Sequence, residues 1–369
     1  MKIGLLAYDL TTLAGGTNLA LTLGRELQKA GHELAYACVY EDLRSLAGKF
    51  DVAADFKIYR VGAPVFGKAM KTYNSMLNHS LPIYRMCREF KPDVVIETGG
   101  FLLSSAVPVM LGIPTIYYCL EPQREYSRGS FMNRLYFTPY TLIEPYLLKR
   151  VKTCAISAYT GRLIRKHSGG EVTVIYPPVD TEIFKPGIEK ENIILCVLRF
   201  LPGYRFEEMI LAFRRLQRTD YSLVIIGGLA KENKGYYDNL RKMIKDDTNI
   251  TLLPNADFST LLDYYKKARF FWYPTGAYYG ISVAEAQSAG LPVVSFGGDS
   301  GPGEIIIDAG TGFLVKTFDE MVEKSKSLIN NRQLRERMSI SARENAVSRL
   351  GTTTFCTKFN DVIRRIVSR

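Results

Sequence analysis

The chain has 369 residues, with 48 Lys and Arg against 37 Asp and Glu, a formal net charge of +11 and 47% hydrophobic residues. This length predicts two domains, and the even spread of charge argues against long disordered tails. No apolar run reaches the roughly 18–20 residues of a membrane-spanning helix, and the N-terminus runs into a strand without a signal-peptide pattern, which predicts a cytoplasmic protein. The six cysteines have neither CxxC pairs nor histidines at metal-ligand spacing, so we expect reduced thiols and no metal site.

The first half of the chain alternates strands with helices. Residues 2–8 form an apolar run of strand length, and the Gly15-Gly16 turn that follows leads into leucines at helical spacing. Further strands are expected at 33–40, 93–96, 114–118, 153–157 and 172–176. Continuous apolar strands that alternate with helices predict a parallel sheet covered on both faces.

A second series of strands begins after the stretch 181–192, whose Pro186-Gly187 pair and mixed charge make it the best linker candidate. Strands are expected at 193–198, 222–226, 250–253, 270–273, 292–295 and 312–315, with helices from Met321 to the C-terminus. The predicted fold class is therefore α/β, with two doubly wound, Rossmann-like domains facing across a cleft. Ligands of such sheets bind at the carboxyl ends of the strands.

Two stretches hold much of the excess positive charge. Residues 124–166 carry nine Lys and Arg against Glu125 and Glu144, and residues 57–91 carry seven against Glu89. Aromatic residues are interleaved in the first stretch, among them Tyr126, Phe131, Tyr136, Phe137, Tyr140 and Tyr146. These stretches are either solvated helix faces or a surface for anionic lipid, where aromatic rings lie at the headgroup level. No nucleic-acid-binding module is recognisable, so we expect no nucleic-acid partner.

Several segments resemble, in their order along the chain, those of one enzyme family. They are 174–184 (VIYPPVDTEIF), 199–202 (RFLP), 285–294 (EAQSAGLPVV), 301–306 (GPGEII) and 310–315 (GTGFLV). Together they are similar to the retaining nucleotide-sugar glycosyltransferases of family 4, which have the GT-B fold. The resemblance covers nearly the whole chain. The segments 177–180 (PPVD) and 117–124 (YYCLEPQR) look closest to members that build lipid-linked oligosaccharides and surface polysaccharides.

The resemblance implies transfer of a sugar from a nucleotide diphosphate sugar to a lipid- or glycan-linked acceptor, with retention of configuration and without a cofactor. It implies an acceptor-side domain over 1–185, a donor domain over 186–345, and a C-terminal helix over 346–369 that crosses back to the first domain. Together with the basic stretches 57–91 and 124–166, it indicates a peripheral position on the inner face of an anionic membrane.

The resemblance also assigns roles to individual residues. Arg199 corresponds to the family's diphosphate-binding arginine, and Glu285 to the glutamate that accepts hydrogen bonds from the donor ribose. With Arg205, these are the predicted catalytic residues. No Asp-x-Asp motif is present, so arginines and helix N-termini are expected to neutralise the leaving diphosphate in place of a metal. The residues expected to bind the donor are Gly15, Gly16, Tyr204, Ala277, Tyr279, Gly280, Ile281, Ser282 and Glu285.

Three positions depart from the family pattern. Tyr204 stands where the family usually has a lysine, Ala277 where it has the first of two paired glutamates, and Leu120 where it often has a histidine. Loss of one preorganised group that stabilises charge typically raises a barrier by ~3–4 kcal/mol. In an active enzyme of altered chemistry, Arg205 can replace the missing lysine. The alternative is a catalytically inactive pseudo-glycosyltransferase that binds or activates a partner.

Overall fold

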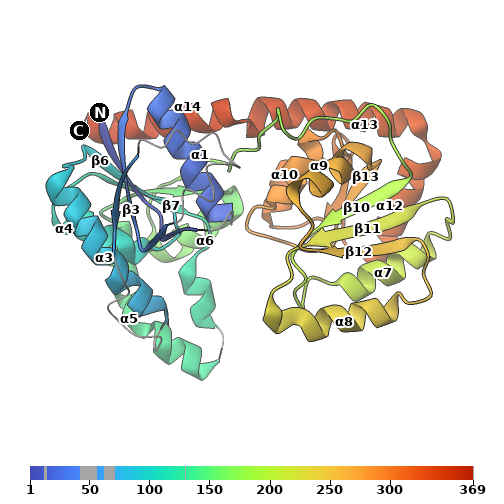
Figure 1. The fold of residues 1–369 in the computed structure, drawn as a ribbon, viewed down its shortest axis with the longest axis horizontal. Coiled ribbons are helices and arrows are strands. Elements are labelled where there is room, and N and C mark those ends of the chain that lie inside the picture. The colour runs from blue at the N-terminus through green and yellow to red at the C-terminus, as the bar shows by residue number, and fades with distance from the viewer. Residues whose placement is uncertain (12–14, 42–55, 62–70, 129, 369) are drawn as a thin grey trace. The chain divides into compact units, whose positions relative to one another are not determined.

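The computed structural model describes residues 1–11, 15–41, 56–61, 71–128 and 130–368. The chain divides into two compact units (Figure 1): unit 1 comprises Met1–Pro177 and Phe355–Arg369, and unit 2 comprises Pro178–Thr354. None of the helices within the described ranges is long and apolar enough to cross a membrane. Each unit contains one large parallel sheet between layers of helices, as the alternation of strands and helices predicts.

Unit 1 is built on a seven-stranded sheet. Its strands, in spatial order, are β5 (Lys57–Arg60), β3 (Glu33–Cys38), β1 (Lys2–Leu6), β6 (Val94–Glu97), β7 (Thr115–Cys119), β8 (Lys152–Ala155) and β9 (Val172–Val174). All neighbours pair in parallel. A separate two-stranded ladder joins β2 (Asp9–Leu10) and β4 (Tyr40–Glu41). The sequence pattern did not single out β5, because this edge strand is short and polar at both ends.

The helices of unit 1 pack by apolar faces. They are α1 (Gly15–Lys29), α3 (Lys71–Glu89), α4 (Ala106–Met110), α5 (Phe131–Leu148), α6 (Ala158–Ser168) and α14 (Thr352–Val367), with the 3-10 turns η1 (Leu102–Ser105) and η2 (Gln123–Arg128). In α1 the buried leucines Leu19, Leu23 and Leu27 recur every four residues and so share one face. Figure 1 shows α1 and α3 on opposite faces of the sheet.

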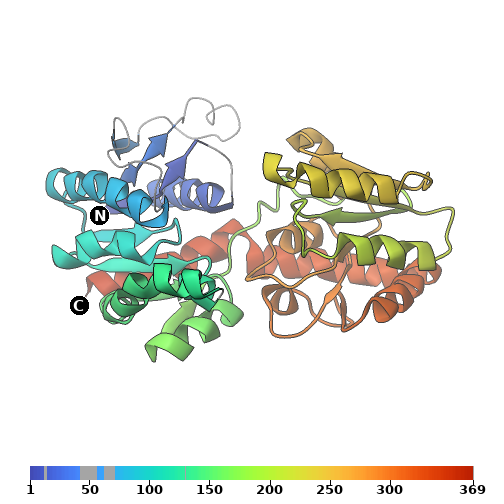
Figure 2. The same ribbon diagram turned by 90° about the horizontal axis from the view of Figure 1, so that it is seen from below.

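Unit 2 is built on a six-stranded parallel sheet. Its strands, in spatial order, are β12 (Ile250–Pro254), β11 (Ser222–Gly227), β10 (Ile193–Val197), β13 (Phe270–Tyr273), β14 (Val293–Phe296) and β15 (Gly312–Val315). Its helices are α7 (Phe206–Arg215), α8 (Lys234–Met243), α9 (Phe258–Lys267), α10 (Ile281–Ser288), α11 (Gly301–Ile305), α12 (Phe318–Asn330) and α13 (Arg332–Asn345), with the short turns η3 (Lys231–Asn233) and η4 (Ala346–Leu350). Figures 1 and 2 show α7 and α8 on one face of this sheet, and Figure 1 shows α9 and α10 on the other.

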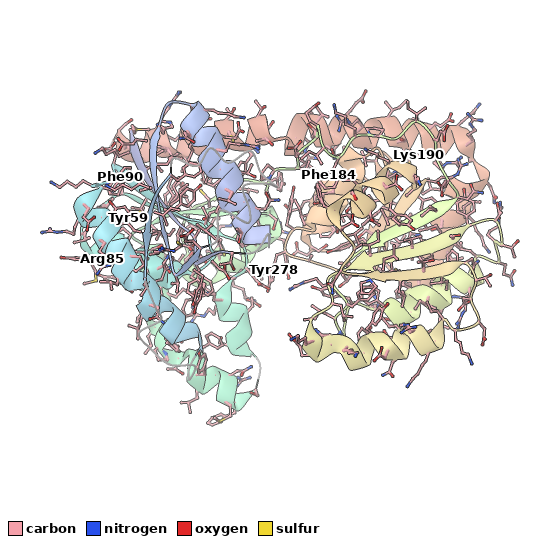
Figure 3. The ribbon with its side chains drawn as sticks, in the orientation of Figure 1. Tyr59, Arg85, Phe90, Phe184, Lys190 and Tyr278 are labelled. Atoms are coloured by element: carbon pink, nitrogen blue, oxygen red, sulfur yellow. The ribbon has the colours of Figure 1, made fainter. Side chains whose placement is uncertain are left out.

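The units divide after residue 177, whereas the boundary that the family resemblance implies lies after residue 185. The reason lies in Phe184, whose contacts fall within unit 2. Its ring lies 5.2 Å from the ring of Tyr265, and its carbonyl oxygen accepts a hydrogen bond from Arg343 at 3.1 Å. Figure 3 labels this phenylalanine in unit 2. The start of the linker candidate is therefore part of the unit 2 core.

The end of the chain forms two helical segments rather than one helix over 346–369. Gly351, in an extended conformation, separates η4 from α14. From Phe355 onward the chain belongs to unit 1. There the rings of Phe355 and Phe359 lie 6.2 and 5.1 Å from the ring of Tyr118 in β7, so burial of aromatic surface holds α14 against unit 1.

Candidate active site

The predicted donor-binding segments lie beyond the carboxyl ends of neighbouring strands in unit 2. The chain runs from β10 outward to β11 and β12 and then returns to β13, so the strand order reverses between β10 and β13. Open α/β sheets bind ligands beyond the carboxyl ends of the strands at such a reversal. Arg199 follows β10, and the loop 274–280 follows β13. Both segments therefore meet at the edge where a ligand is expected.

Arg199 has an exposed side chain beside two tyrosines. Its Nη2 donates a hydrogen bond to the Tyr204 hydroxyl oxygen at 3.4 Å. Both side chains also influence the pKa of Tyr273, the last residue of β13. Burial raises this pKa most, Tyr204 raises it further, and the positive charge of Arg199 lowers it. These three residues from two adjacent strand ends therefore form one cluster, with the guanidinium on its solvent side.

Arg205 is held by a different set of contacts. Its backbone has a φ of 61°, in the left-handed region, directly before α7. Its Nε and Nη2 each donate to the carboxylate of Glu208 at 2.7 Å. Its guanidinium carbon lies 4.5 Å from the ring centroids of both Phe296 and Phe318. A cation that is bidentate to a carboxylate and in contact with two rings is already paired, so a move toward a donor would break these contacts.

The loop before α10 is closely packed against α11. Gly280 has a φ of 92°, which favours glycine, and a Cβ added there would lie 3.1 Å from Cγ of Pro302. The carbonyl oxygen of Ala277 accepts a hydrogen bond from the backbone N–H of Gly301 at 2.8 Å. These contacts fix the path of the chain into α10, where the backbone N–H of Val283 donates a hydrogen bond to the carbonyl oxygen of Gly280 at 3.0 Å.

Glu285 lies in the second turn of α10 and is partly exposed. Its Oε2 accepts a hydrogen bond from the Tyr265 hydroxyl at 2.8 Å, and that hydroxyl also lies 3.4 Å from the carbonyl oxygen of Ser282. Burial raises the pKa of Glu285 to about 7, and the bond from Tyr265 opposes this rise. Of the other predicted donor residues on this segment, Tyr279 and Ser282 are buried and Ile281 is exposed.

The glycine turn and Leu120 come together in unit 1. The strand order of its sheet reverses between β1 and β6. A Cβ added to Gly16 would lie 3.4 Å from Cδ1 of Leu120, and one added to Gly100 would lie 3.6 Å from Cβ of Leu120. The leucine at the histidine position therefore packs between the start of α1 and the loop after β6. Gly15 begins α1, and residues 12–14 before it lie outside the described residues.

Glu97, the last residue of β6, was not predicted as a site residue. Its side chain is fully buried. Its Oε1 accepts a hydrogen bond from the N–H of Gly99 at 2.9 Å and its Oε2 one from the N–H of Gly100 at 3.1 Å. Burial raises the pKa of Glu97 to about 8, and these amides oppose the rise. The available signal was a charged residue that ends an apolar run and precedes two glycines. Glu97 thereby positions the loop that packs on Leu120.

Ser300, between β14 and α11, was not singled out either. Its hydroxyl oxygen is buried and has no hydrogen-bond partner among the described residues. A Cβ added to Gly276 would lie 3.6 Å from Cβ of Ser300, so the loops after β13 and β14 approach each other here. A buried hydroxyl without a partner is costly and marks a place where a ligand or water supplies the bond. Within the described ranges, no group of three His, Cys, Asp or Glu side chains could hold a metal ion.

Two family models match the chain, one in each half. Residues 178–345 match the model for glycosyl transferases group 1, and residues 13–183 match the model for glycosyltransferase family 4. An uncharacterized glycosyltransferase from Haemophilus influenzae is 22% identical over 354 residues, which cover 93% of this chain and 94% of that relative. Both halves of the chain thus point to the same kind of protein.

Solved structures are similar over nearly the whole chain. HepE from Anabaena, in complex with UDP, has a TM-score of 0.76 at 15% identity and covers 99% of this chain and 100% of its own. WaaG, a glycosyltransferase involved in lipopolysaccharide biosynthesis, has a TM-score of 0.73 at 15% identity, with 98% and 99% covered. These likenesses confirm the predicted α/β fold with two Rossmann-like domains. The chain is a glycosyltransferase family 4-like protein with the GT-B fold.

Proposed function

We propose that the protein transfers a hexose-type sugar from a nucleotide diphosphate sugar to a lipid- or glycan-linked acceptor, with retention and without a metal. One observation carries the proposal. Arg199 and Glu285 lie on the segments that follow β10 and β13, the two strands between which the sheet order reverses. The likeness to HepE, whose structure contains UDP, supports a nucleotide donor.

The two residues have complementary tasks in this reaction. Departure of a nucleoside diphosphate leaves negative charge, which an exposed guanidinium such as that of Arg199 stabilises by charge-assisted hydrogen bonds. The N-terminus of α10 adds positive potential through the helix dipole. The carboxylate of Glu285 accepts hydrogen bonds from ribose hydroxyls. Tyr204 supplies a neutral hydroxyl where the family usually has a cation, so charge stabilisation rests more heavily on Arg199.

A catalytically inactive binding partner is the second candidate, and the contacts of Arg205 favour it. That side chain is already committed to a carboxylate and two rings, so it is poorly placed to replace the missing lysine. Ala277 offers a methyl group in place of a carboxylate. We favour the enzyme because Arg199 and Glu285 are groups that a pure scaffold has no chemical need to keep.

Sugar transfer and donor hydrolysis by the wild-type chain test the proposal. Uridine, guanosine and thymidine diphosphate sugars are tested in parallel. We expect the wild type to turn over sugars of one nucleotide class, and we expect Glu285→Ala to lose this turnover. A folded sample that binds nucleotide without transfer or hydrolysis would favour the inactive candidate. A folded sample that binds no nucleotide would overturn the donor-site assignment itself.

For the acceptor, we infer that α5 rests on a membrane surface. Six large apolar side chains of this helix are exposed, and the most open are Phe131 at 78% and Leu142 at 74%. This apolar stripe comprises Phe131, Met132, Leu135, Leu142, Ile143 and Tyr146. Its members recur at spacings of three to four residues or their multiples, which places them on one side of the helix. An exposed apolar face of this size is typical of an interaction surface.

Cationic groups accompany the apolar stripe. The exposed Lys149 and Arg150 follow α5, and the Arg150 guanidinium carbon lies 3.6 Å from the ring centroid of Tyr146. A helix with an apolar face and flanking cations suits an anionic bilayer, which attracts the charges and buries the stripe. The role of WaaG in lipopolysaccharide biosynthesis supports a glycolipid acceptor at such a surface. The other basic stretch, 57–91, includes residues 62–70, which lie outside the described residues, so the proposal rests on α5.

A further inference from the structure

A cavity in unit 2 lies at the ends of the strands opposite those that carry Arg199 and the loop 274–280. Its volume is about 470 Å³. Five cationic side chains contribute to its lining: Lys190, Arg218, Arg269, Arg332 and Arg335. Two carboxylates accompany them, those of Asp220 and Glu336. This excess of positive charge in a concave site attracts anions.

Three neighbouring strands bring residues to the cavity at their amino ends. Asn192 precedes β10, Tyr221 precedes β11 and Arg269 precedes β13. Because β11, β10 and β13 are adjacent and parallel, their amino ends form one edge of the sheet. The Nε of Arg269 donates a hydrogen bond to Oδ1 of Asn192 at 2.6 Å, which fixes the guanidinium at this edge. The junction of α12 and α13 contributes Arg332 to the same cavity.

Three of the five cations have partners that account for them. Arg218 donates two hydrogen bonds of 2.7 Å to the carboxylate of Asp220. Arg332 donates one of 2.6 Å to Glu336. Arg335 donates to carbonyl oxygens in the last turn of α12, where helix carbonyls lack partners within the helix. These side chains build the wall of the cavity.

Lys190 has no such partner. Its Nζ is buried and makes no hydrogen bond to any of the residues that the structure describes. Burial and the nearby charge of Arg269 lower the pKa of Lys190 to about 8. The neighbouring Glu191 pairs with Lys267 instead, at 3.5 Å. Figure 3 labels Lys190 in unit 2. A buried ammonium beside a second cation destabilises the folded chain unless an anion supplies the missing charge.

We propose that this cavity binds a small phosphate-bearing anion between Lys190 and Arg269. The ammonium offers three donors and the guanidinium a planar fork, and both suit phosphate oxygens. The cavity volume fits a small molecule. The site is separate from the donor edge, because the five residues of β10 separate the two edges by about 16 Å. This proposal is therefore independent of the proposed sugar transfer, and either one can be wrong without the other.

Calorimetric titration of the full chain with inorganic pyrophosphate at low salt tests this site. We expect Lys190→Met, which keeps the apolar stem and removes the charge, to weaken binding at least tenfold. The matched control Lys245→Met removes an exposed lysine of the same unit and should leave the affinity within twofold of the wild type. Pyrophosphate also resembles a donor diphosphate, so the same titrations are repeated with Arg199→Ala, where the loss caused by Lys190→Met should persist.

Thermal melting gives a second test, in which Lys190→Met should change the melting temperature in opposite ways without and with pyrophosphate relative to the wild type. Without pyrophosphate, Lys190→Met should melt at or above the wild-type Tm, because the variant removes a buried unpaired charge. Because pyrophosphate can also bind at Arg199, the melts are compared in the Arg199→Ala background. There pyrophosphate should raise the Tm of Arg199→Ala alone and of its combination with Lys245→Met, but not that of its combination with Lys190→Met. No binding by the wild type would overturn the proposal. Equal binding by wild type and Lys190→Met, or a loss of the difference in the Arg199→Ala background, would overturn it as well.

Discussion

The hydroxyl of Tyr265 donates a hydrogen bond to Oε2 of Glu285 at 2.8 Å. The Tyr265 side chain is fully buried and its ring stacks on Phe271 with centroids 6.1 Å apart, so the core fixes where the hydroxyl lies. The bond favours the ionised carboxylate, whereas burial raises its pKa to about 7. Glu285 therefore changes charge near neutral pH, and its role as acceptor for ribose hydroxyls requires the ionised form.

The affinity for a nucleoside diphosphate should fall as the pH drops through about 7, because protonated Glu285 loses acceptor capacity. Tyr265→Phe removes the bond that lowers this pKa, so the fall should begin at a higher pH. The affinity of Glu285→Gln should change with pH only through the ionisation of the ligand. Calorimetric titration at a series of pH values around 7 measures the affinity of the wild type and of both variants. Parallel profiles for the wild type and Glu285→Gln would rule out Glu285 as the titrating group.

Glu97 should make the stability of unit 1 depend on pH. Burial raises the pKa of its carboxyl group from 4.5 to about 8, so between these values the folded chain binds a proton that the unfolded chain has lost. The free energy of unfolding should therefore fall as the pH rises through this window, by an amount on the order of a few kcal/mol. Glu97→Gln removes the titrating group, so its urea midpoint should change less with pH. Equal slopes for both chains would contradict the assignment.

The apolar stripe on α5 should govern binding to vesicles. Phe131→Ser and Leu142→Ser should each reduce co-sedimentation with anionic vesicles severalfold, since each removes exposed apolar area. Ile340→Ser, on α13, removes a residue that is 62% exposed and serves as the control. Binding should also weaken with added salt, because the charge contribution is screened. Equal binding to neutral and anionic vesicles, or none to either, would reject the membrane surface.

Restoring the family's residues should separate the enzyme from the inactive candidate. If the chain is an enzyme with an adapted pocket, Tyr204→Lys, Ala277→Glu and Leu120→His should lower turnover or change the preferred donor. If it is inactive, the wild type should show neither transfer nor hydrolysis, while partner binding survives Glu285→Ala. An unpaired carboxylate introduced at position 277 would cost several kcal/mol, so circular dichroism must confirm folding of that variant. Robust wild-type transfer would exclude the inactive candidate.

Much of the fold is predictable because it depends on local pattern. The strands 270–273 and 312–315 have the predicted bounds, since each is an uninterrupted apolar run buried in a parallel sheet. The unit boundary is not local. It depends on Phe184 packing against Tyr265, a residue far along the chain, and no periodicity in 178–185 reveals that contact.

The candidate site is predictable in part for the same reason. The family resemblance singles out Arg199 and Glu285, and the strand pattern predicts that Arg199, two residues after β10, lies at an edge of the sheet. Contacts between side chains on distant segments cannot be predicted in this way. The guanidinium of Arg205 is held in contact with the rings of Phe296 and Phe318, and no local sequence signal connects these residues to it. The burial of Lys190 likewise depends on strands and helices that meet only in the folded unit.

The most direct test is the calorimetric affinity of the wild type and of Arg199→Ala for a nucleoside diphosphate. If unit 2 holds the diphosphate through this guanidinium, the variant should bind at least tenfold more weakly, a loss of about 1.4 kcal/mol. Arg241→Ala, which removes an exposed arginine of α8, is the matched control and should bind like the wild type. Unchanged affinity in a correctly folded Arg199→Ala sample would contradict the donor site proposed for this protein.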